Sequence, residues 1–157
     1  MNIRSIMTDQ VKYVHENTGL LVVKELFASN DFHHIPVLDN AGTVTGMISR
    51  LDYHLVLDHF TIFRVDKAER TNDRFLGALI AKDVMSRKVA TVDPDMLVEE
   101  ANRIFLENLF HALPVVENGH LVGIITTHDL LKFYSELVAG QKLIERKEIG
   151  QMEKGEE

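Results

Sequence analysis

Residues 111–129 read HALPVVENGHLVGIITTHD, and residues 33–52 read HHIPVLDNAGTVTGMISRLD. Both stretches carry the same features in the same order: a histidine, a proline in an apolar run, a polar turn, a glycine, a hydroxyl residue and an aspartate. His111 follows His33 by 78 residues, whereas Asp129 follows Asp52 by 77, so the second turn is one residue shorter. A register that continues across a one-residue gap in a turn indicates a duplication, and the chain is predicted to be a tandem repeat.

The duplication extends toward the N-terminus. Ser5-Ile6-Met7-Thr8 matches Asp83-Val84-Met85-Ser86, and Phe27 matches Phe105. Each copy begins with a short apolar stretch, continues with apolar residues at helical spacing, forms a hairpin and closes with a second helix. This order predicts a β-α-β-β-α unit in each copy.

The first helix of the second copy is the easier one to place. Apolar residues at helical spacing begin at Val98, while Asp93 and Pro94 suit an N-cap and the first helical position. Pro36 and Pro114 lie within the apolar runs of the two hairpins. Because proline has no N–H group, each is expected at a strand start or on a sheet edge.

One unit has too few elements to cover its own apolar faces, so the two copies are predicted to pack about a pseudo-two-fold axis. The fold class is α/β, of the α+β kind. The predicted boundaries are 1–60 for the first repeat, 61–79 for a connecting segment, 80–138 for the second repeat and 139–157 for a charged tail. The connecting segment is expected to contain a helix, because Phe75, Leu76, Leu79 and Ile80 have helical spacing. The tail is expected to be either an exposed helix or disordered.

Composition narrows the functional classes. The chain of 157 residues has no cysteine, which excludes disulfides, thiolate metal sites and cysteine nucleophiles. A formal net charge of −7 argues against general nucleic-acid binding, which needs a basic face. No apolar run approaches the roughly 18 residues of a membrane span, and the first ten residues do not resemble a signal peptide. We therefore expect a cytoplasmic protein that binds neither nucleic acid nor membrane.

The candidate site lies where each hairpin leads into a helix. Ser49 precedes Asp52 by three positions, and Thr126 precedes Asp129 by three. The plain interpretation is a capping box, in which the hydroxyl and the carboxylate satisfy free N–H groups at a helix start. The functional interpretation uses the same geometry: a helix N-terminus and a hydroxyl suit a phosphate, and a carboxylate can accept hydrogen bonds from a ribose. Both interpretations remain open at this point.

These motifs resemble the CBS domain, the cystathionine-β-synthase-type repeat. The second copy carries Val-Met-Ser, Val-Ala-Thr-Val-Asp-Pro-Asp, His-Ala-Leu-Pro-Val-Val and Gly-Ile-Ile-Thr-Thr-His-Asp, and the first carries Phe-His-His-Ile-Pro-Val and Gly-Met-Ile-Ser-Arg-Leu-Asp. The resemblance covers nearly all of residues 1–138. It implies a stand-alone tandem pair that forms a homodimer and regulates a separate protein without catalysis. It also implies that an adenosyl ligand (AMP, ADP, ATP or S-adenosylmethionine) binds as a regulatory ligand in clefts between the repeats.

The resemblance implies roles for single residues. Asp52 and Asp129 match the family's ribose-binding aspartate, while Ser49 and Thr126 match its phosphate-binding hydroxyl. Two further positions would contribute backbone to the adenine pocket, namely those of Lys12 and Ala90.

Three histidines match positions that face phosphates in the family. His33 and His34 in the first copy, and His111 and Ala112 in the second, lie where nucleotide-sensing members often have a His-Arg pair. Both arginines are missing, and Ala112 cannot replace one, so the chain departs from the pattern for triphosphate binding. We therefore expect two related but unequal sites.

Three functional hypotheses follow. The first is a regulatory sensor in which an adenine nucleotide shifts the packing of the repeats. The second is a dimerisation or protein-interaction module with empty clefts, whose aspartates serve only as caps. The third is a small enzyme that uses the histidines. The sequence has no His-x-x-x-His pair with a neighbouring glutamate and no Gly-x-Ser-x-Gly elbow, so we expect neither a metal site nor catalysis.

Overall fold

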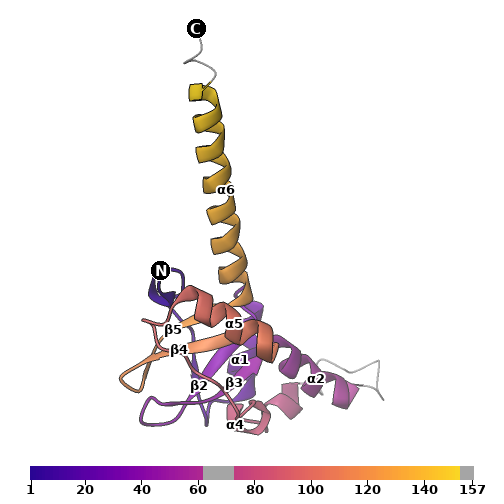
Figure 1. The fold of residues 1–157 in the computed structure, drawn as a ribbon. Coiled ribbons are helices and arrows are strands. Elements are labelled where there is room, and N and C mark those ends of the chain that lie inside the picture. Colours follow the sequence, from indigo (N-terminus) through magenta and orange to yellow (C-terminus); the bar gives the residue numbers. More distant parts are fainter. Residues whose placement is uncertain (62–72, 153–157) are drawn as a thin grey trace.

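The computed structural model describes residues 1–61 and 73–152, with side-chain surroundings for residues 1–57 and 73–141. Two small sheets with flanking helices form the body of the molecule, and one long helix extends away from it (Figure 1). Within the described ranges, no helix combines the length and the hydrophobicity needed to cross a bilayer.

The first repeat has the predicted β-α-β-β-α order. Its elements are β1 (Val14–His15), α1 (Leu20–Ala28), β2 (His34–Leu38), β3 (Val44–Ser49) and α2 (Arg50–Thr61). In the sheet, β2 pairs in parallel with β1 and antiparallel with β3. Helix α1 forms because Leu20, Val23 and Phe27 recur at helical spacing and bury one face against this sheet.

The second repeat follows the same plan with a weaker first strand. Its elements are α5 (Val98–Asn108), β4 (Ala112–Glu117), β5 (His120–Thr126) and α6 (Thr127–Met152), and the short helix α4 (Ala81–Val84) precedes them. Strands β4 and β5 pair antiparallel. A single parallel bridge from Val92 to Val115 takes the place that β1 has in the first repeat. The prediction of two β-α-β-β-α-like units is thereby confirmed.

The prediction that Asp93 caps a helix beginning at Pro94 is wrong. Helix α5 begins at Val98, and Asp93 instead closes a turn by accepting the N–H of Asp95 at 2.8 Å. The carbonyl oxygen of Pro94 accepts the N–H of Arg4 at 3.0 Å. Residues 93–97 are kept out of the helix because their backbone pairs with the N-terminal segment.

The prediction that each proline lies at a strand start or on a sheet edge is confirmed for Pro114, which lies in a two-stranded sheet, but it is wrong for Pro36. Pro36 is the third residue of β2, the middle strand of its sheet, and Pro114 is the third residue of β4. In the second repeat, parallel pairing begins with the bond from the Val92 N–H to the Pro114 carbonyl, at 3.0 Å. In a strand, the nitrogen and the carbonyl group of one residue point to the same side. The nitrogen of Pro114 therefore points toward the segment just before Val92, where the parallel pairing has not yet begun. No ladder hydrogen bond is lost there.

The helix predicted for the connecting segment ends before Leu79 and Ile80, and one predicted boundary lies inside a helix. Within the connecting segment, residues 73–76 are helical, whereas residues 62–72 lie outside the described residues. The predicted boundary at residue 138 falls inside α6, which continues to Met152. Most of the predicted tail is therefore part of the long helix that projects from the body (Figure 1).

The core of each repeat is completed by a segment that precedes the other repeat. We call residues 1–8 the N-terminal arm and residues 76–86 the central arm. Ile3 of the N-terminal arm is fully buried in the core of the second repeat, among Leu113 and Ile125. Leu76 and Ala81 of the central arm are fully buried in the core of the first repeat. Burying one such aliphatic side chain contributes about 1.5–3 kcal/mol, so each arm stabilises the opposite repeat.

The arms are also bonded through the backbone. The N–H of Ile3 donates to the carbonyl of Met96 at 2.9 Å, and the N–H of Ala81 donates to the carbonyl of Thr18 at 2.8 Å. Beyond these bonds, each arm pairs with a strand of the opposite repeat: Thr8 bridges to Ile124 in β5, and Ser86 bridges to Met47 in β3. The two repeats are therefore joined by exchanged segments as well as by packing.

Candidate functional site

Both strand-to-helix junctions form the capping box. Oδ2 of Asp52 accepts the N–H of Ser49 at 2.9 Å and its hydroxyl at 2.6 Å. Oδ2 of Asp129 accepts the N–H of Thr126 at 2.8 Å and its hydroxyl at 2.7 Å. Among the residues that the structure describes, Oδ1 of each aspartate has no hydrogen-bond partner. Capping and ligand binding can therefore use different oxygens of one carboxylate.

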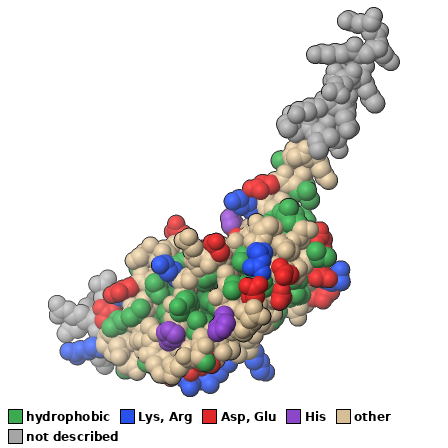
Figure 2. Space-filling model, turned by 90° about the vertical axis from the view of Figure 1, so that its left-hand side faces the viewer, with side chains coloured by type: hydrophobic (Ala, Val, Ile, Leu, Met, Phe, Trp, Pro, Cys, Tyr) green, Lys and Arg blue, Asp and Glu red, His purple; other side chains and the backbone are tan. Residues whose placement is uncertain are grey.

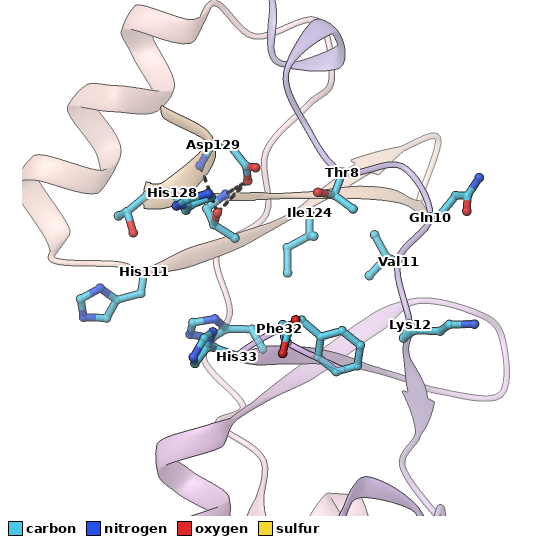
Figure 3. Close-up of a pocket in the computed structure, with 14 residues that line it drawn as sticks. Thr8, Gln10, Val11, Lys12, Phe32, His33, His111, Ile124, His128 and Asp129 are labelled. Carbon is cyan, nitrogen blue, oxygen red and sulfur yellow. Dashed lines mark hydrogen bonds between the residues drawn. The ribbon is translucent and has the colours of Figure 1, made fainter. Parts of the chain in front are cut away.

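A cleft of about 500 Å³ opens between the repeats beside Asp129 (Figure 3), and we call it the large cleft. The second repeat contributes the end of β5 and the start of α6, with His111 from the loop before β4. The first repeat contributes residues 31–34, and residues 8–12 follow the N-terminal arm across the cleft. Ile124, Val11 and Phe32 form an apolar wall in the middle of the cavity (Figure 3).

A second cleft, of about 180 Å³, lies beside Asp52 in the pseudo-symmetric position, and we call it the small cleft. Here β3 and α2 of the first repeat face residues 86–90 and 110–113 of the second. Phe110 takes the place that Phe32 has in the large cleft, and Ala112 takes the place of His34.

The structure divides the nine predicted site residues between these two clefts. The large cleft is lined by Lys12, His33, His34, His111, Thr126 and Asp129. The small cleft is lined by His34, Ser49, Asp52 and Ala90. Each aspartate thus faces a segment that precedes or belongs to the opposite repeat. The sequence pattern did not predict this pairing, because matched positions identify equivalent residues and not their neighbours.

Sequence reasoning missed the apolar walls. Val11, Phe32 and Ile124 line the large cleft, yet apolar residues in such a pattern are ordinarily taken as core. The available signal was their equivalence to Val89, Phe110 and Met47, which line the small cleft in the same way. Phe32 is only partly buried, unlike the aliphatic residues of the core.

Histidine is the commonest titratable residue of the large cleft, where His33, His34, His111 and His128 are found. Burial lowers the pKa of His34, and the nearby His111 and His33 lower it further, while Asp52 acts in the opposite direction. The Lys12 side chain extends away from the cavity (Figure 3). Hydrophobic and histidine side chains occur together on one face of the body (Figure 2).

The described residues contain no group of three or more histidine, aspartate or glutamate side chains arranged to hold a metal ion. The large cleft brings together an apolar wall, one carboxylate oxygen that has no partner among the described residues, and a helix N-terminus. Such a combination suits a flat apolar ring joined to a group with vicinal hydroxyls.

Comparison with known proteins gives one consistent family. The CBS domain model matches residues 3–57 and 81–136. The uncharacterized protein MJ1426 of Methanocaldococcus jannaschii is 32% identical over 152 residues, covering 84% of this chain and 90% of that protein. The chain also matches longer relatives, among them MJ1404 of the same organism, of which it spans 33%.

Solved structures share the fold. CBSX2 of Arabidopsis thaliana, solved in complex with AMP, is 24% identical with a TM-score of 0.68, covering 87% of this chain and 97% of CBSX2. The CBS domain pair of protein MJ0100, solved with 5′-methylthioadenosine and S-adenosyl-L-methionine, is 19% identical with a TM-score of 0.69, covering 87% and 97%. At these identities the likeness concerns the fold of the paired repeats.

Proposed function

The chain belongs to the CBS domain family, and from this premise we propose that it is a regulatory module that binds an adenosyl ligand in the large cleft between its repeats. The ligand would be an adenine nucleotide, such as AMP or ATP, or an S-adenosyl compound. Because both repeats contribute to the cleft, a bound ligand would favour one arrangement of the repeats over another. The module would act on a separate protein and would carry no catalytic residue of its own.

The observation that carries the proposal is the position of Asp129. Its carboxylate is partly buried at the edge of a cleft of about 500 Å³, and Oδ1 has no partner among the described residues. Small-molecule sites commonly have volumes of about 300–1,000 Å³ and combine an apolar lining with a few polar groups. A carboxylate used only as a helix cap would not require an adjoining cavity of this size.

The cleft suggests how an adenosyl ligand would lie. The adenine ring would pack against the apolar wall of Val11, Phe32 and Ile124. The ribose hydroxyls would donate to Oδ1 of Asp129. The 5′ substituent would then lie toward the histidines and the N-terminus of α6, whose partial positive charge favours an anion. Thr126 could offer its hydroxyl there by rotating away from Asp129.

Related structures support the ligand class. CBSX2 was solved with AMP and the MJ0100 pair with 5′-methylthioadenosine and S-adenosyl-L-methionine, and the shared part of these ligands is the adenine base with its ribose ring. The proposed contacts of Val11 and Asp129 involve that shared part. They therefore leave the 5′ substituent open, and the histidines are the residues in a position to select it.

We propose one ligand per chain. The small cleft, at about 180 Å³, falls below the usual range for a nucleotide-sized ligand. Asp52 and Ser49 would then act mainly as the cap of α2, and the capping interpretation would hold for one junction while the binding interpretation holds for the other.

We also propose that two copies associate. Helix α2 exposes Leu51 and Leu55, one turn apart, at 67% and 57% of their surfaces. Exposed apolar residues that share a helix face are typical of an interaction surface. A homodimer would bring the clefts of two chains into one regulatory assembly.

The test is calorimetric titration with AMP, ATP, S-adenosylmethionine and 5′-methylthioadenosine, using two matched variants. Asp129→Asn removes the charge while keeping an oxygen that can cap, and Asp52→Asn makes the same change at the small cleft. We expect at least one ligand to bind, Asp129→Asn to weaken it about 10-fold or more, and Asp52→Asn to change it less than about 2-fold. Equal effects of the two variants would contradict the assignment to the large cleft.

The second candidate function is a dimerisation or protein-interaction module without a ligand. The completed capping boxes favour it, because both aspartates already have a structural role. If none of the four compounds raises the melting temperature or gives a binding isotherm while the protein is dimeric by light scattering, this second function is the correct one.

A further inference from the structure

His34 is the residue that the two clefts have in common. Among the residues lining each cleft, His34 alone lines both. It is the first residue of β2 and lies opposite Ser49 in the β2–β3 register, so it begins beside the small cleft. Its counterpart, Ala112, lines only the small cleft and carries no ionisable group. One ionisable residue therefore borders both clefts.

Charged and titratable residues line the clefts on both sides of His34. Those of the large cleft come from both repeats: Lys12, Asp31, His33, His111, His128 and Asp129. Those of the small cleft are Asp52 on α2 and Lys88 on the segment before Val89. Apart from Lys12, whose side chain points away from the cavity (Figure 3), the residues lining the large cleft that can carry a positive charge are its histidines.

Without a ligand, the surroundings favour the neutral form of His34. Burial, His111 and His33 all lower its pKa, and Asp52 only partly opposes them. An anion in the large cleft would reverse this balance, because an opposite charge at close range favours the protonated ring. An uncharged ligand would leave the ring as it was.

We propose that His34 determines which ligand charge the large cleft accepts, so that an adenosyl ligand with an anionic 5′ group binds together with one proton taken up from solvent. An uncharged adenosyl ligand binds without a proton. This inference rests on the proposed function of the large cleft and adds the means by which ligands are distinguished. It makes the affinity for a phosphate-bearing ligand rise as the pH falls.

The shared position of His34 extends the effect to the small cleft. Once protonated by an anion in the large cleft, the ring also places a positive charge near Asp52. Binding of an anion in the large cleft thereby changes the electrostatic environment of Asp52, which caps α2. This helix carries the exposed Leu51 and Leu55. The link needs no movement of the backbone.

The test compares two ligands whose own charge is constant: adenosine, which is uncharged, and the methyl ester of AMP, which keeps one negative charge from pH 5.5 to pH 8. Calorimetry in two buffers of different ionisation enthalpy measures the protons taken up per ligand bound. We expect the methyl ester to bind at least about 5-fold more tightly at pH 6 than at pH 8, with net proton uptake, and adenosine to bind equally at both.

Three variants assign the proton. His34→Gln should remove most of the proton uptake and with it the tighter binding of the methyl ester at pH 6. His34→Arg, with a permanent charge, should bind the methyl ester tightly at both pH values. His33→Gln is the matched control and should retain at least half of the uptake.

The outcomes separate the two proposals. If adenosine binds but the methyl ester shows no pH dependence, or if His34→Gln keeps the full proton uptake, the role of His34 is overturned and the ligand site remains. If neither adenosine nor the methyl ester binds at any pH, the proposed function itself fails and this inference fails with it.

Discussion

At the scale of single residues, Gly46 and Gly123 mark where the arms cross the sheets. A Cβ added to Gly123 would lie 2.6 Å from Sδ of Met7, and one added to Gly46 would overlap the side chain of Met85. Each glycine therefore allows a methionine of the opposite arm to lie directly on the strand. The methionines matched each other in the sequence, and so did the glycines, but their contact was not predictable from either match.

Gly46→Ala is expected to destabilise the protein by about 1–3 kcal/mol, because the added methyl group must displace Met85 from a packed site. Urea unfolding measures the change. The double variant Gly46→Ala with Met85→Ala should lose less free energy of unfolding than the two single variants lose together, because the second change removes the overlap. A loss below about 0.5 kcal/mol for Gly46→Ala alone would mean that Met85 does not press on the strand.

His34 also makes stability depend on pH when no ligand is present. Its pKa is lower in the folded chain than the ordinary value of about 6.5, so the unfolded chain binds more protons as the pH falls through that value. The contribution of His34 to the free energy of unfolding is therefore present above about pH 6.5 and is lost as the pH falls toward the lowered pKa. We expect His34→Gln to show a shallower loss of stability between pH 7.5 and pH 5 than wild type, measured by urea unfolding at several pH values. An unchanged slope would assign the acid sensitivity to other groups.

At the scale of elements, the two repeats close their first helices in different ways. Nη2 of Arg50 donates to the carbonyl oxygens of Phe27 and Asn30, each at 2.8 Å, and of Phe32 at 3.0 Å, so it holds the end of α1. In the second repeat the equivalent residue is Thr127, and α5 instead ends at Leu109 in a left-handed conformation with φ of 54°. The segments that follow these ends contribute Phe32 and Phe110 to the two clefts.

Arg50→Ala should lower stability by about 2–3 kcal/mol, because three carbonyl groups at the end of α1 lose a charged donor. Thr127→Ala is the matched change in the second repeat and should stay within about 0.5 kcal/mol. Thermal and urea unfolding of both variants measure the difference. If Arg50→Ala and Thr127→Ala lower the free energy of unfolding equally, the hydrogen bonds from Arg50 do not stabilise the end of α1.

The elements were largely predictable from the sequence, for physical reasons that differ from place to place. The hairpins and α1 follow from local apolar periodicity and from glycine-containing turns, so their order was correct. The start of α5 was not, because Asp93 and Pro94 form a good local helix start that is overruled by pairing with Arg4 in the N-terminal arm. Ser49, Asp52, Thr126 and Asp129 were found because capping boxes are local patterns, whereas the cleft walls depend on contacts between repeats.

At the scale of the whole molecule, the exchanged arms determine how the repeats hold together. The N-terminal arm contributes the fully buried Ile3 to the core of the second repeat, and the central arm contributes Leu76 and Ala81 to the core of the first. Sequence alone could not predict this exchange, since an apolar residue such as Ile3 fits a nearby core as well as a distant one. The arms also lead directly into both clefts, through Thr8 and Ser86.

Ile3→Ala is expected to cost about 2–5 kcal/mol, the usual range for removing a large aliphatic side chain from a core. Hydrogen exchange should become faster in β4 and β5 of the second repeat before it does in β2 and β3, although Ile3 lies at the start of the chain. Arg4→Ala is the control in the same arm: Arg4 contacts Glu117 at 2.5 Å, but this exposed pair is expected to contribute little to stability because solvent screens it. Faster exchange confined to the first repeat would contradict the exchange of arms.

The crossing of the two arms also changes what counts as a half of this protein. A cut anywhere between residues 61 and 73 would give two fragments, each of which carries a piece that the other needs to finish folding. Such fragments should reassemble when mixed, as a split protein does, whereas either one alone should remain incomplete. For the same reason, a gene segment encoding one repeat could not be moved into another protein and fold there unaided: the pair is the smallest portable unit.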